Sequence, residues 1–222
     1  MKIKTVKRGS ALLLLYVLMI VVTAAFTLMF FLPSLAWRLA PYRQLEVWAV
    51  DKTVPYPNYR EHAGLFWILK HEKIAKTGSR QLYMEDSDYY GFYPYGEEEW
   101  RGVPLPVAGI KPDLIYIADT YGVYRDDYMQ KRLSGEWSPK LYGGLSTEDI
   151  TTIRQNLGGG NTFIAEFNTA ASPTNFYDRE TLGRLLGVNW SGWIGRYFVD
   201  LSKGNDVPDW VVENYEEKKK EA

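Results

Sequence analysis

Between residues 142 and 169, a capped helix runs into three glycines and then into a short apolar strand. Ser146 is a favoured N-cap residue, and Asp149 three positions later completes a capping box with Asp in place of Glu. The glycines at 158–160 end the helix, because glycine adopts the left-handed conformation without a Cβ clash. A strand that starts with residues 162–165 and ends near 166–168 follows. A helix that leads into a short apolar strand is half of a βαβ unit, and such units build parallel sheets.

The rest of the chain repeats this alternation of strands and helices. Apolar runs predict strands at 45–50, 89–93 and 114–118, and helical spacing predicts helices over 60–74 and 172–186. Ser172 resembles an N-cap with proline at the first helical position, and Gly187 ends that helix. We therefore expect an α/β fold, in which an N-terminal transmembrane helix precedes a domain with a doubly wound, mostly parallel, flavodoxin-like sheet.

The N-terminal segment contains a run of residues without any charge from Ala11 to Leu32. At 1.5 Å per residue a helix of this length crosses a hydrocarbon core of about 30 Å. We interpret residues 11–36 as an uncleaved transmembrane signal anchor. The alternative is a cleaved signal peptide, because Ser34-Leu35-Ala36 resembles a cleavage site, although such peptides have a shorter apolar region of about 7–15 residues.

Charge is distributed unevenly along the chain. Six basic residues and no acidic one lie in residues 1–43, so the other 20 basic residues accompany all 27 acidic ones, a net charge of −7 beyond residue 43. The basic cluster before the apolar run places residues 1–10 in the cytoplasm and the rest outside, in the cell membrane as a single-pass protein. We expect an extracytoplasmic α/β domain over 44–205 and a charged, frayed tail over 206–222. For an α/β domain the sequence ends early, which leaves two alternatives: later strands are absent, or the natural chain continues.

Composition excludes several classes of site. There is no cysteine, which excludes disulfides, thiolate metal sites and cysteine nucleophiles, and there are two histidines. We expect neither a metal site nor a cofactor. An acidic domain repels phosphate backbones, so nucleic acid is not an expected partner.

Acidic residues lie at the carboxyl ends of three predicted strands: Asp51, Asp119 and Glu166. Ligands of open parallel sheets bind at this edge, and paired carboxylates there can act as general acid and base. If the protein is an enzyme, these three are the catalytic candidates. The candidate ligand-binding residues around them are Asn168, Ser172, Thr174, Arg196, Tyr121 and Trp193. The alternative for each acid is a structural role, as a helix cap or as the partner of an arginine such as Arg196.

The order of strands and helices from Leu45 to Leu201 resembles the class I glutamine amidotransferase-like superfamily. Its trehalose-utilisation-type and β-galactosidase-trimerisation-type members are often not amidotransferases. Asp113-Leu114-Ile115 opens one strand of the resemblance, and Ile164 to Asn168 is the strand that carries the nucleophilic cysteine in the family. Asn168 occupies that position here, the Gly-x-Cys-x-Gly turn is absent, and no later His-Glu pair follows. The resemblance therefore implies the architecture without amidotransferase activity.

Two main functions remain open from the sequence, beside a third in which the anchor and the aromatic surface serve only the assembly of a membrane complex. In the first, the chain is a membrane-anchored accessory or binding domain of the cell envelope that binds a glycan or a partner protein. In the second, it is a carboxylate-dependent hydrolase of envelope or exported polysaccharide, with Glu166 as the acid/base. His62, near a helix start, is expected to be a surface or capping residue in both.

Overall fold

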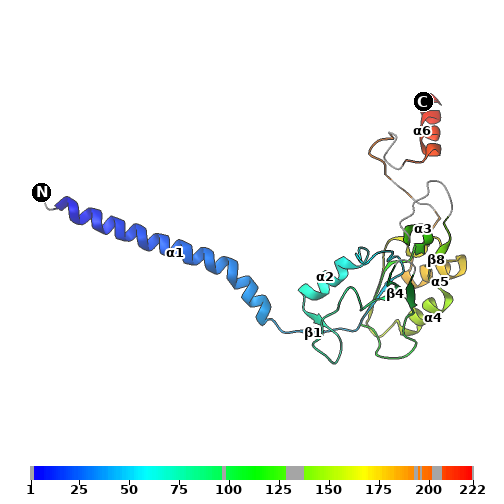
Figure 1. The fold of residues 1–222 in the computed structure, drawn as a ribbon, viewed down its shortest axis with the longest axis horizontal. Coiled ribbons are helices and arrows are strands. Elements are labelled where there is room, and N and C mark those ends of the chain that lie inside the picture. The colour runs from blue at the N-terminus through cyan, green and yellow to red at the C-terminus, as the bar shows by residue number, and fades with distance from the viewer. Residues whose placement is uncertain are drawn as a thin grey trace.

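The computed structural model describes residues 3–96, 99–128, 138–192, 195, 197–201 and 207–221. A long helix, α1, leads into an α/β domain, and a last helix, α6, follows it (Figure 1). The helices are α1 (Ile3–Leu39), α2 (Ala63–His71), α3 (Arg125–Tyr128), α4 (Thr147–Asn156), η1 (Phe167–Ala170, a 3-10 helix), α5 (Phe176–Leu186) and α6 (Asp209–Glu221). The strands are β1 (Arg43–Gln44), β2 (Val47–Asp51), β3 (Ile74–Ala75), β4 (Tyr90–Pro94), β5 (Trp100–Val103), β6 (Leu114–Asp119), β7 (Val123–Tyr124), β8 (Lys140–Tyr142) and β9 (Thr162–Ala165).

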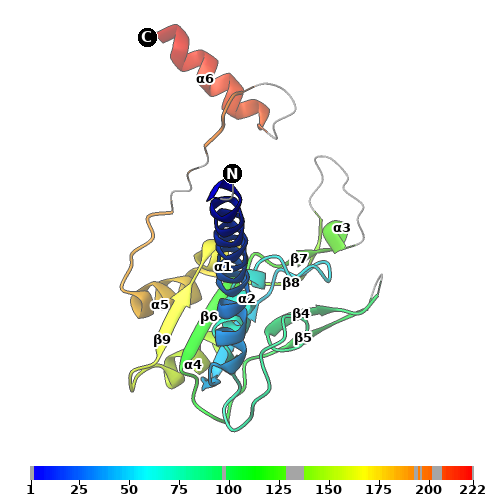
Figure 2. The ribbon, with the colours of Figure 1, turned by 90° about the vertical axis from the view of Figure 1, so that its left-hand side faces the viewer.

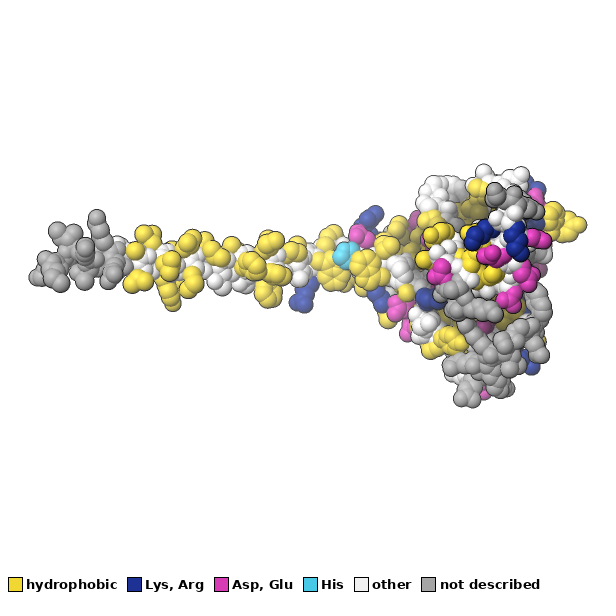
Figure 3. Space-filling model, turned by 90° about the horizontal axis from the view of Figure 1, so that it is seen from above, with side chains coloured by type: hydrophobic (Ala, Val, Ile, Leu, Met, Phe, Trp, Pro, Cys, Tyr) yellow, Lys and Arg dark blue, Asp and Glu magenta, His cyan; other side chains and the backbone are white. Residues whose placement is uncertain are grey.

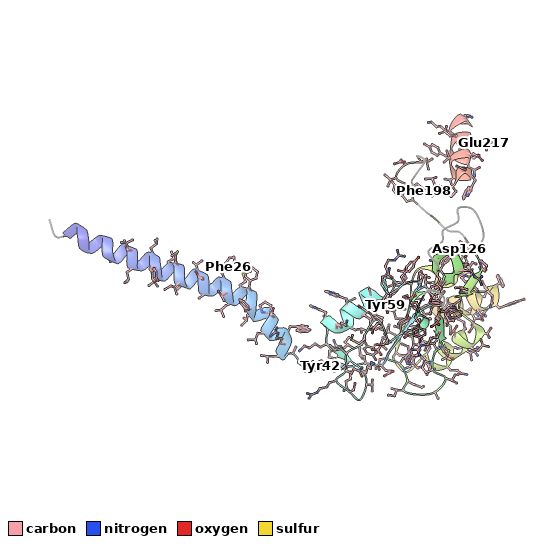
Figure 4. All side chains as sticks on the ribbon, viewed as in Figure 1. Phe26, Tyr42, Tyr59, Asp126, Phe198 and Glu217 are labelled. Carbon is pink, nitrogen blue, oxygen red and sulfur yellow. The ribbon has the colours of Figure 1, made fainter. Side chains whose placement is uncertain are left out.

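Helix α1 contains an apolar segment, Gly9–Leu39, that is long and apolar enough to cross a membrane. The segment is 31 residues long and none of its strongest apolar window is buried against the domain. It includes the predicted span at 11–36. Side chains such as Phe26 project freely from it (Figure 4).

The main sheet has the strand order β5-β4-β2-β6-β9. Neighbouring pairs among β4, β2, β6 and β9 are parallel, whereas β5 is antiparallel to β4. The prediction of an α/β fold is confirmed, but the sheet is mixed, so a fully parallel flavodoxin-like sheet is not confirmed. The reason is the short connection between β4 and β5, since a parallel crossover needs about a dozen residues or more.

The two faces of the sheet carry different helices. Val47 and Ala49 of β2 pack with Phe66 and Leu69 of α2. The alternate residues of the same strand pack on the opposite face, in a cluster that α4 and α5 complete: Trp48, Val50, Ile150, Ile153 and Leu182. Figures 1 and 2 show α2 on the side of the sheet from which α1 emerges, with α4 and α5 on the far side. The domain therefore has three layers, and α2 is the layer nearest α1.

The capped helix and the strand after it form as the sequence predicts. Ser146 caps α4, and its side chain and that of Asp149 exchange hydrogen bonds with each other's backbone N–H. Strand β9 starts at Thr162 and lies parallel to β6. Local capping chemistry and the glycine stop are sufficient to define this unit, because each acts within a few residues.

The N-cap of α5 differs from the prediction. The helix begins at Phe176, and the Asn175 side chain accepts a hydrogen bond from the backbone N–H of Asp178 at 3.0 Å. Ser172 lies three residues before this cap, outside the helix, so its assignment as the N-cap was wrong. Gly187 ends α5 in the left-handed conformation, as predicted. The C-terminal tail, predicted to be frayed, contains α6.

Candidate functional site

Asp51 and Asp119 lie side by side where β2 and β6 end. Thr53 joins them, because its backbone N–H donates to Asp51 Oδ1 at 2.8 Å and its hydroxyl donates to Asp119 Oδ1 at 2.9 Å. Both acids are buried. The structure thus brings two of the three predicted acids together, but beneath the surface.

Asp51 forms a buried pair with His62, which sequence reasoning did not select. Nδ1 of His62 lies 2.6 Å from Asp51 Oδ2, and Nε2 lies 2.9 Å from the carbonyl oxygen of Glu85. Because a carbonyl only accepts, Nε2 carries a hydrogen, and the Nδ1–Asp51 contact then requires one further proton between the two groups. Burial raises the pKa of the Asp51 carboxyl, against the opposing effect of the His62 hydrogen bond. The pair is therefore net neutral as a unit.

The expectation that His62 is a surface residue was wrong, although it does occupy the N-cap position of α2. It is 0 % exposed, and its side chain makes no capping hydrogen bond to α2. Aromatic rings surround it, with ring centroids 4.6 Å away at Tyr89 and 5.1 Å away at Phe66. The βα connection causes this placement, since it returns the start of α2 over the end of β2. The Asp51–His62 pair is thus sealed from solvent.

Asn168 also belongs to the hydrogen-bond network around Asp119. Its amide donates to Asp119 Oδ2 at 3.3 Å, and the backbone N–H of Tyr121 donates to Asp119 Oδ1 at 2.6 Å. Both oxygens of Asp119 are therefore occupied by the chain itself. Asn168 links the end of β6 to η1.

Glu166, the third predicted acid, is exposed and is oriented differently. Its carboxylate hydrogen-bonds the hydroxyl of Tyr116, whose pKa is raised mainly by burial and also by this acceptor. Within the described residues, no hydrogen bond joins Glu166 to Asp51 or Asp119. In the described part of the chain, Glu166 therefore stands outside the hydrogen-bond network that joins Asp51 and Asp119.

Of the remaining predicted ligand-binding residues, one is buried, two are exposed and two lie outside the described residues. Thr174 is buried, where its hydroxyl accepts from the N–H of Leu145 at 3.0 Å and donates to the carbonyl of Thr169 at 3.1 Å. Ser172 is exposed, and Tyr121 is exposed with its ring 5.1 Å from that of Tyr124. Trp193 and Arg196 lie outside the described residues, and so does the predicted Glu166–Arg196 pair.

A buried ion pair closes the same edge of the sheet. Lys52 Nζ lies 2.5 Å from Asp149 Oδ2 and donates to the carbonyl of Gly144 at 3.0 Å. Asp149 is also the second residue of the α4 capping box. This contact fixes the end of β2 to the start of α4, and the sequence did not indicate it because the partners are 97 residues apart.

An open pocket of about 260 Å³ lies elsewhere, beside β2 and β4. Strand β4 pairs with β2 only at Val50 and Asp51, so the first half of β2 has no strand on that side. Tyr83 takes that place, since its hydroxyl accepts from the N–H of Val47 at 2.9 Å and donates to the carbonyl of Leu45 at 2.8 Å. The pocket lining combines tyrosine rings with charged side chains: Tyr83, Tyr89, Tyr90, Tyr93, Glu46, Lys76, Asp88 and Arg101.

The charges of this tyrosine-lined pocket are of both signs. Lys76 Nζ lies 2.5 Å from Asp88 Oδ1, and the Arg101 guanidinium lies 5.1 Å from the ring centre of Tyr93. Partial burial raises the pKa of Glu46, with a smaller opposing effect from the Thr77 hydrogen bond. Burial also raises the pKa of Tyr90. These groups offer hydrogen-bond donors and acceptors next to aromatic rings.

A second hollow of about 220 Å³ lies along α5 and is lined in part by Trp190. The Arg179 guanidinium lies 4.8 Å from the ring centre of Trp190. No group of three or more histidine or acidic side chains in the described part of the chain could hold a metal ion.

Comparison of the chain with family models, with curated proteins and with solved structures found no match in any of the three. The interpretation of the site therefore rests on its geometry.

Proposed function

We propose that this chain is a membrane-anchored, extracytoplasmic binding domain of the cell envelope, and that it binds a glycan in the tyrosine-lined pocket. The domain is catalytically silent as an amidotransferase. Helix α1 is the anchor, and the basic residues before it favour a cytoplasmic N-terminus.

The tyrosine-lined pocket is the observation that carries this proposal. Sugar rings present apolar faces that stack on aromatic side chains and hydroxyls that hydrogen-bond to charged groups. The pocket has the charged groups Glu46, Arg101 and the Lys76–Asp88 pair beside tyrosine rings, of which Tyr90 is half-buried and the other three are buried. Its volume, about 260 Å³, lies just below the range of about 300–1,000 Å³ that is usual for small-molecule pockets, which suits one unit of a longer polymer.

The carboxyl edge of the sheet supports a silent domain. Asp51 is 0 % exposed, and both oxygens of Asp119 accept hydrogen bonds from the chain. Glycoside hydrolysis needs two accessible carboxyl groups about 5–9.5 Å apart on either side of a substrate. Buried acids with filled hydrogen bonds do not meet this requirement, so the hydrolase hypothesis has less support than binding.

The proposed ancestry is a degenerate amidotransferase-like fold. The four parallel strands follow the order β4-β2-β6-β9, which is the first part of a flavodoxin-like order. In that family the nucleophile follows the strand that corresponds to β9, where this chain has Asn168. Asn168 instead donates to Asp119.

A thermal-shift screen of the full chain in lipid nanodiscs tests the proposal. The probes are envelope and exported polysaccharides and their oligosaccharides, and the same wells are assayed for released sugar. A glycan at 100 times its Kd should add about 2.7 kcal/mol to the unfolding free energy. Glu46→Gln and Arg101→Ala should remove the shift, while Arg154→Ala, an exposed residue of α4, should keep it.

Each outcome has a distinct meaning. A shift without released sugar that the two pocket variants abolish supports the proposal. A shift that persists in both variants contradicts the assigned pocket. Released sugar that disappears in Glu166→Gln restores the hydrolase hypothesis, and the absence of any shift favours a protein partner over a glycan.

A further inference from the structure

The junction between α1 and the domain is held by two side chains. The indole Nε1 of Trp37 donates to the carbonyl of His71, the last residue of α2, at 2.6 Å. The ammonium of Lys73 is buried and donates to the carbonyls of Arg38 at 2.8 Å and Ala40 at 2.9 Å. Lys73 thus caps the C-terminal end of α1, where a positive charge is favourable.

Aromatic rings complete this junction. Lys73 Nζ lies 4.8 Å from the ring centre of Trp37 and 5.2 Å from that of Tyr42. Figure 4 shows Tyr42 at the point where α1 joins the domain. The connection from α1 to β1 comprises only residues 40–42. The C-terminal end of α2 is therefore held against the end of α1.

Helix α2 is apolar on both of its sides. Phe66 and Leu69 point into the core, whereas Trp67 is 65 % exposed and Ile68 is 50 % exposed. The Trp67 ring stacks on that of His71 with 5.1 Å between ring centres. A helix that is apolar all round is normally buried on all sides. The outer side of α2 therefore lacks a cover within the described chain.

The outer side of α2 is continuous with the apolar surface of α1. Leu39 at the end of α1 is 76 % exposed, and α2 is the layer of the domain nearest to α1. Figure 3 shows hydrophobic side chains along α1 and on the adjoining part of the domain. Whatever surrounds the end of α1 also reaches α2.

We propose that Trp67 and Ile68 insert into the interfacial layer of the membrane that α1 spans, so that the domain lies against the lipid through α2. This inference rests on the proposed anchor. Tryptophan favours the membrane–water interface because its ring is apolar and its N–H is polar, and basic residues near the end of a span suit the same depth. Arg38 in the last turn of α1, and Lys70 and His71 in the last turn of α2, provide such groups.

Lipid-borne quenchers test this proposal in the full-length protein. Because the chain has no cysteine, single cysteines can carry a fluorescent probe without further changes. Three variants are labelled and placed in nanodiscs of zwitterionic phosphatidylcholine that carries a spin label at a shallow acyl position: Ile68→Cys, Arg154→Cys and Leu28→Cys. Residue 68 reports the outer side of α2, 154 the opposite layer in α4, and 28 the span itself.

We expect the probe at 68 to lose most of its fluorescence to the shallow quencher, and the probe at 154 to lose none above the level in unlabelled lipid. Interfacial helices bury their apolar side about 5–10 Å into the boundary of headgroups and acyl chains, which a shallow label reaches. The probe at 28 should be quenched best by a label placed deep in the acyl chain.

The outcomes separate this inference from the proposed anchor. Quenching at 28 without quenching at 68 overturns the docking of α2 and leaves the anchor intact. No quenching at 28 overturns the anchor, and the docking of α2 with it. If the probe at 68 is shielded from both lipid and water, a protein covers α2 instead, which also overturns the proposal. Trp67→Cys repeats the measurement one residue away, and thermal unfolding confirms that each variant is folded.

Discussion

Two parts of the molecule contain similar residues in opposite environments. One is the closed edge of the sheet, where Asp51, Asp119 and His62 are buried, and the other is the tyrosine-lined pocket. Asp51 at the closed edge is sealed beneath Tyr89 and Phe66 with His62, whereas Glu46 in the pocket is partly open to solvent. Asp51 is the last residue of β2, and Glu46 lies directly before that strand. Access to water, rather than residue type, therefore separates a structural acid from one that can meet a ligand.

The closed edge depends most strongly on Gly91, so its replacement has the largest expected effect. A Cβ at this position would lie 1.6 Å from the carbonyl oxygen of Asp51, and φ is +150°. Gly91→Ala must separate β4 from β2, and we expect a loss of more than about 4 kcal/mol in unfolding free energy. Urea denaturation measures it. Gly96→Ala, with open space around the added Cβ, should change stability by less than about 0.5 kcal/mol.

Removal of the buried histidine should have the next largest effect. His62→Ala leaves the Asp51 carboxyl buried without its partner, which costs about 3–5 kcal/mol. His71→Ala, the exposed histidine, is the control and should change the urea midpoint little.

Asp51→Asn tests the proton arrangement of the Asp51–His62 pair directly. The amide can donate to Nδ1 of His62 and its oxygen can accept from the N–H of Thr53, so it reproduces both contacts of the acid. We expect it to retain most of the stability that Asp51→Ala loses. Equal losses for the two variants would contradict the assigned proton arrangement.

The N-cap of α4 should contribute less to the unfolding free energy than the buried Asp51–His62 pair. Ser146→Ala removes a side-chain acceptor for the N–H of Asp149 and should cost about 1 kcal/mol. Ser172→Ala is a matched control, because Ser172 does not cap α5. If Ser172→Ala costs as much as Ser146→Ala, the assignment of Asn175 as the cap is incorrect.

Substitution of Glu46 in the pocket should have the smallest effect on stability, and this effect should depend on pH. The Glu46 pKa is raised from 4.5 in the folded state, so the folded protein binds this proton more tightly than the unfolded chain. Its stabilising contribution is complete below the unfolded pKa and is lost as pH rises through the folded pKa. Glu46→Gln should therefore gain stability relative to the wild type as pH rises above 4.5, by less than about 0.5 kcal/mol. Unfolding curves at several pH values measure this gap, and a gap that shrinks with rising pH would reverse the assigned sign.

Local patterns predicted the elements of the closed edge. The strands β2, β6 and β9 are short apolar runs, and α4 carries its cap and its glycine stop within the same stretch, so neighbouring residues suffice to identify them. The same patterns placed Asp51 and Asp119 at strand ends. They did not show that Thr53 and Asn168 would fill the hydrogen bonds of these acids, because that depends on loops packing over the edge.

The pocket could not be predicted in this way. Its residues come from four separate places: the irregular connection between α2 and β4, the strands β4 and β5, and the start of β2 with the residue before it. His62 was missed for a related reason, since its contact with Asp51 arises only when the βα connection folds back. One signal could have indicated the pair. Asp51 lies at a strand end, and His62 lies 11 residues later at the start of the next helix.

The short connection at residues 40–42 limits where the domain can search for a ligand. Three residues extend at most about 10 Å, and the bonds of Lys73 and Trp37 restrain even that movement. On the proposed anchoring, a domain on such a connection cannot sample the outer layers of an envelope. On the proposed glycan binding, its occupancy then depends on the local density of glycan in the layer next to the membrane, and not on the amount present further out.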